Sequence, residues 1–210
     1  MKLEESSSAA RWDKRYRAAS EPLFGEAPNE YLRMISARSD FTARRVLCLA
    51  DGDGRNGAWL AEQGREVTAV DVSAVAVERA LDLDRRRNVA VKRLVADLAD
   101  WTPPAGEVWD AVFVIYLQGT AALRRRTLEV AAAALAPGGW LVLEGFSKAQ
   151  ARRPDIGPDD ADRLYDLEEL HAAASGLEVV EALAGRVRLD EGPRHSGEAE
   201  VVRFAARRLG

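Results

Sequence analysis

The chain has 210 residues, 47% of them hydrophobic, and a formal net charge of -4 at pH 7. This length and composition can bury one substantial core, and the acidic balance argues against a broad nucleic-acid-binding surface. The sequence has no apolar stretch long enough to span a bilayer, and its first residues include serines in place of a signal peptide's apolar core, so we expect a cytoplasmic protein.

Before residue 41 the sequence predicts two helices separated by a break. Residues 9–19 form a helical pattern with Trp12 and Tyr16 on one side, and residues 29–37 resume it with Tyr31. We expect residues 1–40 to be a helical cover over a domain of residues 41–210, with which they form one compact unit.

From residue 45 onward, strand-like and helix-like stretches alternate. The predicted strands are 45–49, 66–70, 89–96, 110–115 and 140–145, and the predicted helices between and after them are 55–63, 74–86, 120–135 and 166–174. Strands 177–189 and 198–207 are joined by a glycine-bearing loop. The pattern predicts an α/β, Rossmann-like doubly wound sheet, mostly parallel, with a C-terminal antiparallel hairpin at one edge.

The one cysteine and the two histidines do not form a metal-binding pattern. Cys48 falls within a predicted buried strand, where a small apolar side chain is expected more often than a nucleophile. His171 and His195 lack a zinc-like spacing with this cysteine, so we expect no metal. Two arginine runs, 85–87 and 124–126, fall on predicted helices and are expected to be solvated.

The most informative segment is the turn after strand 45–49. Residues 46–57 read VLCLADGDGRNG, in which Gly52, Gly54 and Gly57 have the G-x-G-x-x-G spacing. Glycines in such a turn let the backbone approach a ligand. The next strand ends at Asp71, whose carboxylate can accept a hydrogen bond from each of two ribose hydroxyls. The alternatives are that the glycines only make a tight turn and that Asp71 only caps the following helix.

This segment resembles motif I of the class I S-adenosylmethionine-dependent methyltransferases, and residues 54–64 are similar to the branch related to tellurite-resistance methyltransferases. The resemblance extends from Trp12 to Arg208 and includes Asp97, the 137–139 Pro-Gly-Gly turn and the hairpin. The family pattern has an acid at the position of Cys48 and a glycine at that of Ala50. This departure implies that the usual water-mediated anchor for the cofactor's amino group would be missing, and Asp51 could supply a substitute negative charge.

The resemblance implies that the cofactor lies at the carboxyl ends of the first four strands. Gly52 and Gly54 would admit its methionine portion, and Asp97 with Leu98 would lie near the adenine. The full set of expected S-adenosylmethionine-binding residues is Ala50, Asp51, Gly52, Gly54, Arg55, Asn56, Asp71, Val72, Asp97, Leu98, Ile115 and Tyr116.

Methyl transfer from a sulfonium mainly requires alignment of the nucleophile with the methyl group. A base helps when the acceptor must lose a proton, whereas a thiolate, selenide or tellurium oxyanion is already nucleophilic. His195 and Tyr16 are the candidate catalytic residues, because the loop 192–197 and the N-terminal helix should both reach the ligand end of the sheet. The alternatives are an exposed hairpin histidine and a packing tyrosine. Residues 152–165 are expected to act as a lid.

The sequence thus predicts a methyltransferase that acts on a small-molecule acceptor, with sulfur, selenium or tellurium as possible nucleophiles, and without nucleic-acid or membrane partners. Two alternatives remain open at this point. The glycine turn also suits an NAD(P)-dependent oxidoreductase. The missing acid at Cys48 also suits a non-catalytic cofactor-binding or interaction module.

Overall fold

A seven-stranded sheet, ordered β3-β2-β1-β4-β5-β7-β6, forms the centre of the molecule. The computed structural model describes residues 7–152, 156–158, 160–192 and 194–210. The strands are β1 (Arg45–Leu49), β2 (Glu66–Asp71), β3 (Val91–Val95), β4 (Trp109–Ile115), β5 (Leu135–Phe146), β6 (Leu177–Gly192) and β7 (His195–Arg208). The α-helices are α1 (Ser8–Ala18), α2 (Glu30–Ser36), α3 (Arg55–Glu62), α4 (Ala74–Arg87), α5 (Ala121–Ala134) and α6 (Leu167–Ala173), and two short 3-10 helices are η1 (Lys148–Arg152) and η2 (Ala161–Arg163).

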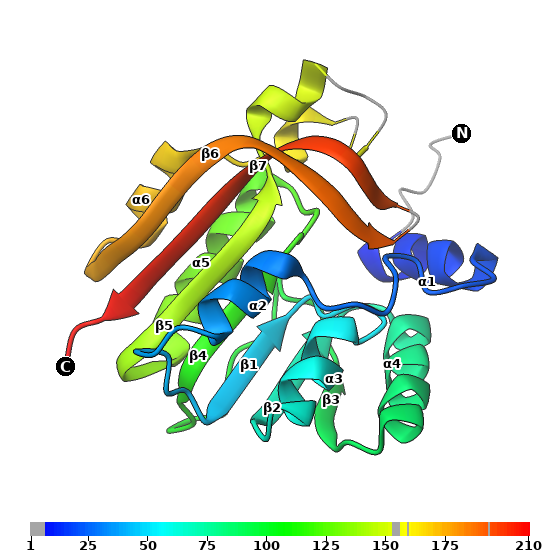
Figure 1. Cartoon of the computed structure of the whole chain (residues 1–210), viewed down its shortest axis with the longest axis horizontal. Coiled ribbons are helices and arrows are strands. Elements are labelled where there is room, and N and C mark those ends of the chain that lie inside the picture. The colour runs from blue at the N-terminus through cyan, green and yellow to red at the C-terminus, as the bar shows by residue number, and fades with distance from the viewer. Residues whose placement is uncertain (1–6, 153–155, 159, 193) are drawn as a thin grey trace.

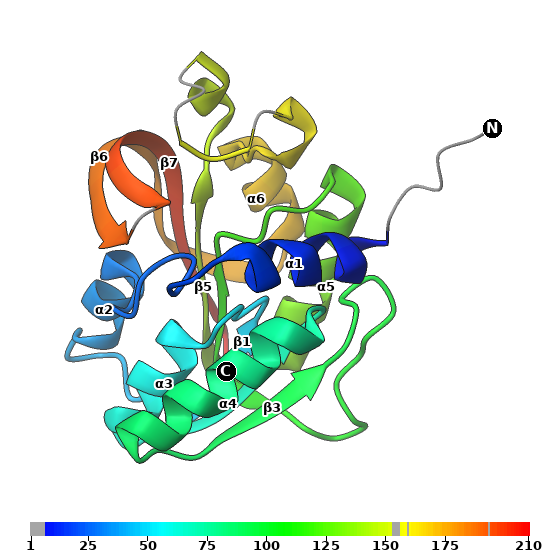
Figure 2. The same cartoon turned by 90° about the vertical axis from the view of Figure 1, so that its right-hand side faces the viewer.

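The pairing confirms the predicted fold class. Strands β1 to β5 pair in parallel, whereas β7 lies antiparallel between β5 and β6. Figures 1 and 2 show helices on both faces of this sheet and the long, curved β6–β7 hairpin at one side. Because the connections between parallel strands must cross over, the carboxyl ends of β1 to β4 meet at one edge.

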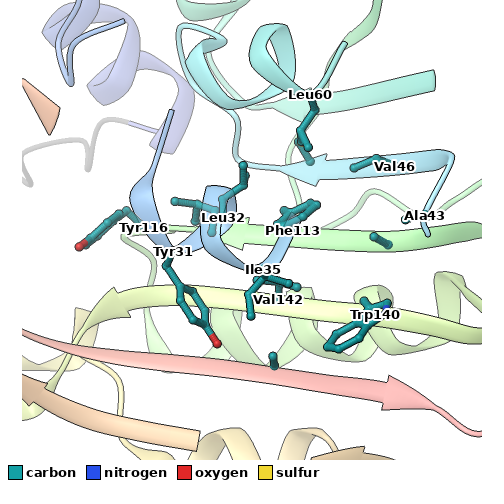
Figure 3. Close-up of a cluster of buried hydrophobic side chains, with 14 of the residues drawn as sticks. Tyr31, Leu32, Ile35, Ala43, Val46, Leu60, Phe113, Tyr116, Trp140 and Val142 are labelled. Atoms are coloured by element: carbon teal, nitrogen blue, oxygen red, sulfur yellow. The ribbon is translucent and has the colours of Figure 1, made fainter. Parts of the chain in front are cut away.

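The alternation of side chains along β1 divides the core into two layers. Val46 and Cys48 face the layer covered by α2 and α3, whereas Leu47 and Leu49 face the layer covered by α5 and α6. Cys48 is buried, as expected. Figure 3 shows the first layer, with residues of α2 and α3 packed against β1, β4 and β5.

The two N-terminal helices pack differently. Tyr31, Leu32 and Ile35 of α2 belong to the main core, and Tyr31 is only 1% exposed. Tyr16 of α1 instead packs in a small separate cluster with Leu23 and Ala76. Tyr31 is therefore part of the core and not of a cover, and α1 is the helix that lies over the rest.

Several predicted boundaries differ because glycine-bearing segments continue strands. β5 starts at Leu135, so the 137–139 turn lies within the strand, where the register with β4 shifts. β6 extends to Gly192, which pairs with His195. The predicted 192–197 loop is thus largely strand, and its register shift marks a bulge, a usual place for glycine in a strand.

Arg124 corrects the expectation of a solvated arginine run. It is 2% exposed, and its guanidinium donates to Glu169 of α6 through Nε at 3.1 Å and Nη2 at 2.8 Å. A two-pronged arginine–carboxylate pair is the strong form of this interaction. Arg124 therefore joins α5 to α6. Within the described ranges, no helix is long and apolar enough to cross a membrane.

Candidate functional site

A cavity lies at the carboxyl ends of the parallel strands and contains about 780 Å³ of empty space, which includes open solvent at its mouth. All the predicted site residues except Gly54 line it. The lining also includes side chains that the sequence did not single out as ligands, among them Ser8, Phe24, Asp53, Leu117, Gln118 and Leu123. The structure thus brings the predicted set together, and the individual roles stay predictions.

The residues follow one another along the sheet edge in strand order. Asp97 follows β3, Asp71 ends β2, Gly52 follows β1 and Tyr116 follows β4, while His195 begins β7 on the opposite side of β5. The two ends of the cavity therefore differ: acids that suit a nucleoside lie toward β3, and aromatic rings lie toward β7.

Gly52 is required by close packing as well as by backbone conformation. Its φ is +59°, and a Cβ at this position would lie 2.5 Å from the Tyr16 hydroxyl oxygen. Ala50 (φ 59°) and Tyr116 (φ 53°) also have left-handed backbones although they carry side chains. Such strain is typical of functional sites, where the surrounding structure must hold it. Both residues sit at strand ends and line the cavity.

Gly54 is the predicted site residue that does not line the cavity. A Cβ on Gly54 would lie 2.6 Å from Cβ of Ala80 and 2.6 Å from Nη2 of Arg93. The absence of a side chain therefore admits α4 and the Arg93 side chain behind the turn, and a contact between the Gly54 backbone and a ligand stays a prediction.

Arg93 is the residue that holds the glycine turn from behind, and the sequence analysis missed it. Its Nη1 donates to Asp51 at 2.9 Å, and its Nε and Nη2 donate to Asp84 at 2.7 and 2.8 Å. Its side chain is 2% exposed. Burial raises the pKa of Asp51, and Arg93 opposes that rise. Arg93 thus balances the Asp51 charge, and the role of Asp51 toward the cofactor's amino group stays a prediction.

Asp71 has the geometry of a ligand acceptor tied to the turn. Its carboxylate accepts from the Gly52 N–H at 2.8 Å and from the Ser73 N–H at 2.9 Å. Burial raises the pKa of Asp71 to about 6. Ser73, not Asp71, caps α4, because its hydroxyl accepts from the Ala76 N–H at 3.1 Å. Each Asp71 oxygen retains a further lone pair for a ligand.

The Asp97 end of the cavity is more open. Asp97 is exposed and accepts from the Ala99 N–H at 2.9 Å, while the neighbouring Leu98 is 5% exposed. This pair combines an apolar side chain with an acceptor at the rim.

His195 lies at the other end and is buried, not exposed in the hairpin. It is 1% exposed, and its ring lies 4.2 Å from that of Tyr116 and 4.8 Å from that of Phe24, centroid to centroid. Neither its Nδ1 nor its Nε2 has a hydrogen-bond partner within the described structure, and the same holds for the Tyr116 hydroxyl. Buried polar atoms without partners are rare in proteins, so a missing ligand or water is the natural partner.

Behind His195, Glu191 belongs to a buried polar network that was not predicted. Glu191 Oε2 lies 3.5 Å from His195 Nδ1 and accepts from Arg55 Nη2 at 2.7 Å. Its Oε1 accepts from Asn29 Nδ2 at 2.8 Å. Burial would raise the pKa of Glu191, but His195 and Arg55 bring it down to about 2. Burial lowers the pKa of His195, and Glu191 opposes that change.

Helix α1 closes the cavity on the outer side. Trp12 and Tyr16 line the cavity, and Asp13 accepts from the Ser73 hydroxyl at 2.6 Å. Burial, followed by the charges of nearby aspartates, holds the pKa of Tyr16 well above its usual range. Tyr16 is therefore a protonated hydroxyl that points at the glycine turn.

The predicted lid over residues 152–165 falls in part on positions 153–155 and 159, which lie outside the described residues. Its described residues do not line the cavity. Tyr165, at its end, is buried and donates to the Leu117 carbonyl at 3.0 Å. The described part supports the loop after β4 and does not cover the site. In the part of the chain that the structure describes, no cluster of His, Cys, Asp and Glu could hold a metal ion.

Comparisons with known proteins agree with this geometry. Residues 46–139 match the family described as a methyltransferase domain. No curated protein matches the sequence. One similar solved structure is described as "Conversion of a Disulfide Bond into a Thioacetal Group during Echinomycin Biosynthesis". Its sequence is 20% identical to this one and its TM-score is 0.76, and the match covers 97% of this chain and 92% of that chain.

Two further solved structures are similar. The N-methyltransferase NodS from Bradyrhizobium japonicum WM9, in complex with S-adenosyl-L-homocysteine, is 17% identical with a TM-score of 0.72, covering 97% of this chain and 100% of NodS. TehB from Haemophilus influenzae is 15% identical with a TM-score of 0.69, covering 95% of this chain and 66% of TehB. At these identities the likenesses show the fold. Residues 46–139 are therefore similar to a methyltransferase domain, and the chain as a whole shares the α/β fold of the solved methyltransferase NodS.

Proposed function

We propose that this protein transfers the methyl group of S-adenosylmethionine to a small molecule with a soft nucleophile, such as sulfur, selenium or tellurium. One observation carries the proposal: a single cavity joins nucleoside-type acceptors, Asp71 and Asp97, to the unpartnered polar atoms of Tyr116 and His195. When bound, the cofactor supplies a methyl group activated by a positive sulfur.

The described residues fit this cofactor. Gly52 lines the cavity, and its N–H donates to the neighbouring Asp71 carboxylate at 2.8 Å. Ribose hydroxyls can donate to Asp71, and Leu98 offers an apolar contact for the adenine, whose amino group can donate to Asp97. Asp53, Asp71 and Asp97 line the cavity, and among the described residues none of them forms a salt bridge, so they suit a ligand with a positive sulfur.

The protein's own residues would position the acceptor at the β7 end. His195, when neutral, has a ring nitrogen that can accept the proton of an acceptor. Tyr116 can donate or accept a hydrogen bond beside it, and Tyr16 reaches the turn from α1. We propose His195 as the catalytic base and Tyr16 as a second residue that contacts the reactants.

The match to a methyltransferase family favours this function over the oxidoreductase and the non-catalytic module. The deciding experiment is calorimetry with S-adenosylmethionine, S-adenosylhomocysteine and NAD, followed by methyl transfer to a panel of thiols, selenols and oxyanions. We expect both sulfur ligands to bind more tightly than NAD, and at least one acceptor to be methylated. Tighter NAD binding, or cofactor binding without any methyl transfer, would reverse the assignment.

A further inference from the structure

We propose that the acceptor enters with an uncharged nucleophile that still carries its proton, as a thiol does near neutral pH, and that an oxyanion such as tellurite is not the acceptor. This inference rests on the proposed function and narrows its acceptor class. The relevant part of the cavity is the aromatic chamber, which is lined by Phe24, Tyr116 and His195. Phe146 lies outside the lining and packs against the Tyr116 and His195 rings.

The charges around the cavity disfavour an anion. Among the described residues that line it, Arg55 is the only lysine or arginine, and Glu191 binds its guanidinium at 2.7 Å. Four aspartates line the same cavity, and Arg93 balances only Asp51. The remaining acids give the cavity a negative field, which attracts a positive sulfur and repels an oxyanion.

The hydrogen-bonding groups of the chamber suit an acceptor group X–H, in which X is the nucleophilic atom of the acceptor and H is the proton that it still carries. The pKa of Tyr116 is held well above its usual range by burial and by the Glu144 and Glu191 charges, so its hydroxyl stays protonated. The Glu191 carboxylate lies 3.5 Å from His195 Nδ1, and its negative charge favours a proton on Nδ1 of a neutral imidazole. Nε2 is then a lone-pair acceptor. An X–H group can donate to Nε2 and accept from Tyr116, whereas an oxyanion would meet the Nε2 lone pair.

Positive charge is found outside the chamber. Arg194 is exposed, and Arg15 stacks over the Trp12 ring at 4.8 Å. Neither arginine partners a nitrogen of His195. The charged or polar groups that face His195 from the packed elements are Glu191 from β6, Arg55 from α3 and Tyr116 after β4. Arg55 disfavours an imidazolium, Glu191 favours it, and burial of the ring favours the neutral form.

The proton balance follows from this arrangement. The X–H bond of the acceptor breaks and its proton passes to Nε2 of His195. The electron pair left on X forms the bond to the methyl carbon, whose bond to sulfur breaks with its electron pair remaining on sulfur. The resulting imidazolium lies beside the Glu191 carboxylate and returns its proton to water. Glu191 is thus a positioning residue, held in place by Arg55 and Asn29.

The test uses the full chain saturated with S-adenosylhomocysteine, whose binding is first verified by calorimetry. Two thiol probes are compared: benzyl mercaptan, which stays protonated near neutral pH, and thiophenol, which ionises near neutral pH. If only the protonated form binds, the affinity for thiophenol falls about tenfold for each pH unit above its own pKa, because the neutral fraction falls by that factor. The affinity for benzyl mercaptan stays constant over the same pH range.

A spectroscopic measurement examines the contact between the acceptor and Nε2 of His195 without turnover. The chain has two histidines, so nitrogen-15 NMR of labelled protein resolves both rings, with a His195→Phe variant to assign them. We expect a neutral His195 ring at pH 7, and an Nε2 resonance that shifts when benzyl mercaptan is added while the His171 resonances stay in place. Thiophenol affinity that rises with pH, displacement of benzyl mercaptan by tellurite, or an imidazolium at His195 at pH 7 would overturn the proposal. Failure of S-adenosylhomocysteine to bind would instead overturn the proposed function.

Discussion

The hydroxyl oxygen of Tyr16 lies 2.5 Å from the position that a Cβ on Gly52 would occupy. Helix α1 therefore rests directly on the glycine turn, and the two elements cannot be varied independently. A side chain at residue 52 would also have to adopt a left-handed backbone, since φ is +59°.

We predict that Gly52→Ala lowers the free energy of unfolding by more than the roughly 1–2 kcal/mol of left-handed strain alone, because Tyr16 must move as well. Tyr16→Phe removes the hydroxyl, so it should recover part of that loss in the Gly52→Ala background. Urea unfolding of the two single variants and the double variant gives the coupling energy. Strictly additive effects would show that the close contact has no energetic consequence.

The affinity for S-adenosylhomocysteine should depend on the ionisation of Asp71. Burial raises the pKa of Asp71 to about 6 from an ordinary value of 3.8. In the free protein the protonated Asp71 therefore stabilises the fold below pH 4, and this stabilisation is lost as the pH rises through 6. Ribose donors favour the ionised carboxylate, so binding should strengthen as the pH rises through 6 and then level off. Calorimetry between pH 5 and 8 should show this rise in the wild type and lose it in Asp71→Ala, which should bind about 1.5–3 kcal/mol more weakly. A pH profile shared by both proteins would place the ribose elsewhere.

Arg93→Met should destabilise the fold strongly. The substitution leaves the carboxylates of Asp51 and Asp84 without their cation, and breaking a buried pair in this way costs about 3–5 kcal/mol. Lys92→Met is the matched control, because Lys92 is the neighbouring residue of β3 and its side chain is 57% exposed. Urea titration of both variants measures the difference. Equal unfolding free energies would mean that the glycine turn does not depend on Arg93.

His195→Ala should lower methyl transfer by about 100-fold or more, the effect expected on loss of a general base. Affinity for S-adenosylhomocysteine should change little, because the ring lies at the opposite end of the cavity from Asp71 and Asp97. His171→Ala, on the exposed side of α6, controls for loss of an imidazole elsewhere. Steady-state kinetics with a thiol acceptor tests the prediction, and unchanged rates would remove His195 from the mechanism.

Helix α1 should become less mobile when cofactor binds. Its Tyr16 packs in a small cluster apart from the main core, and its Trp12 and Tyr16 line the cavity, so a ligand adds contacts that α1 lacks. Hydrogen exchange of residues 8–18 should slow on addition of S-adenosylhomocysteine. Helix α2, already in the main core, is the internal control and should exchange equally in both states. Equal protection of α1 in both states would make it permanent scaffold.

Local patterns were sufficient to predict the sheet and the cofactor end of the cavity. The alternation of short strands and helices predicted a mostly parallel sheet, and the G-x-G-x-x-G spacing identified the turn at Gly52. These features depend on residues close together in the sequence. The same reasoning placed Gly54 at the ligand, which stays a prediction, and it did not reveal that Ala80 and Arg93 pack against this glycine.

The site residues that the sequence analysis missed make contacts with residues far away in the sequence. Arg93 and Asp51 are 42 positions apart, and Arg55 and Glu191 are 136 apart, so no local spacing links them. The parallel register of β2 and β3 brings Arg93 beneath the turn, and the hairpin brings Glu191 and His195 to the cavity. Topology predicted that His195 would approach the ligand end, but its burial among Phe24, Tyr116 and Phe146 depends on side-chain packing that the sequence does not reveal.

The contact between the N-terminal segment and the C-terminal hairpin has a consequence for folding kinetics. Asn29 donates to Glu191 across 162 positions, and a Cβ on Gly192 would lie 2.4 Å from the Gly25 nitrogen. Contacts of such long sequence separation form slowly, because a long loop must close before they can stabilise anything. The nucleoside end, built from residues 46–97, can therefore assemble early, whereas the acceptor end is completed only when the last hairpin docks against the first third of the chain.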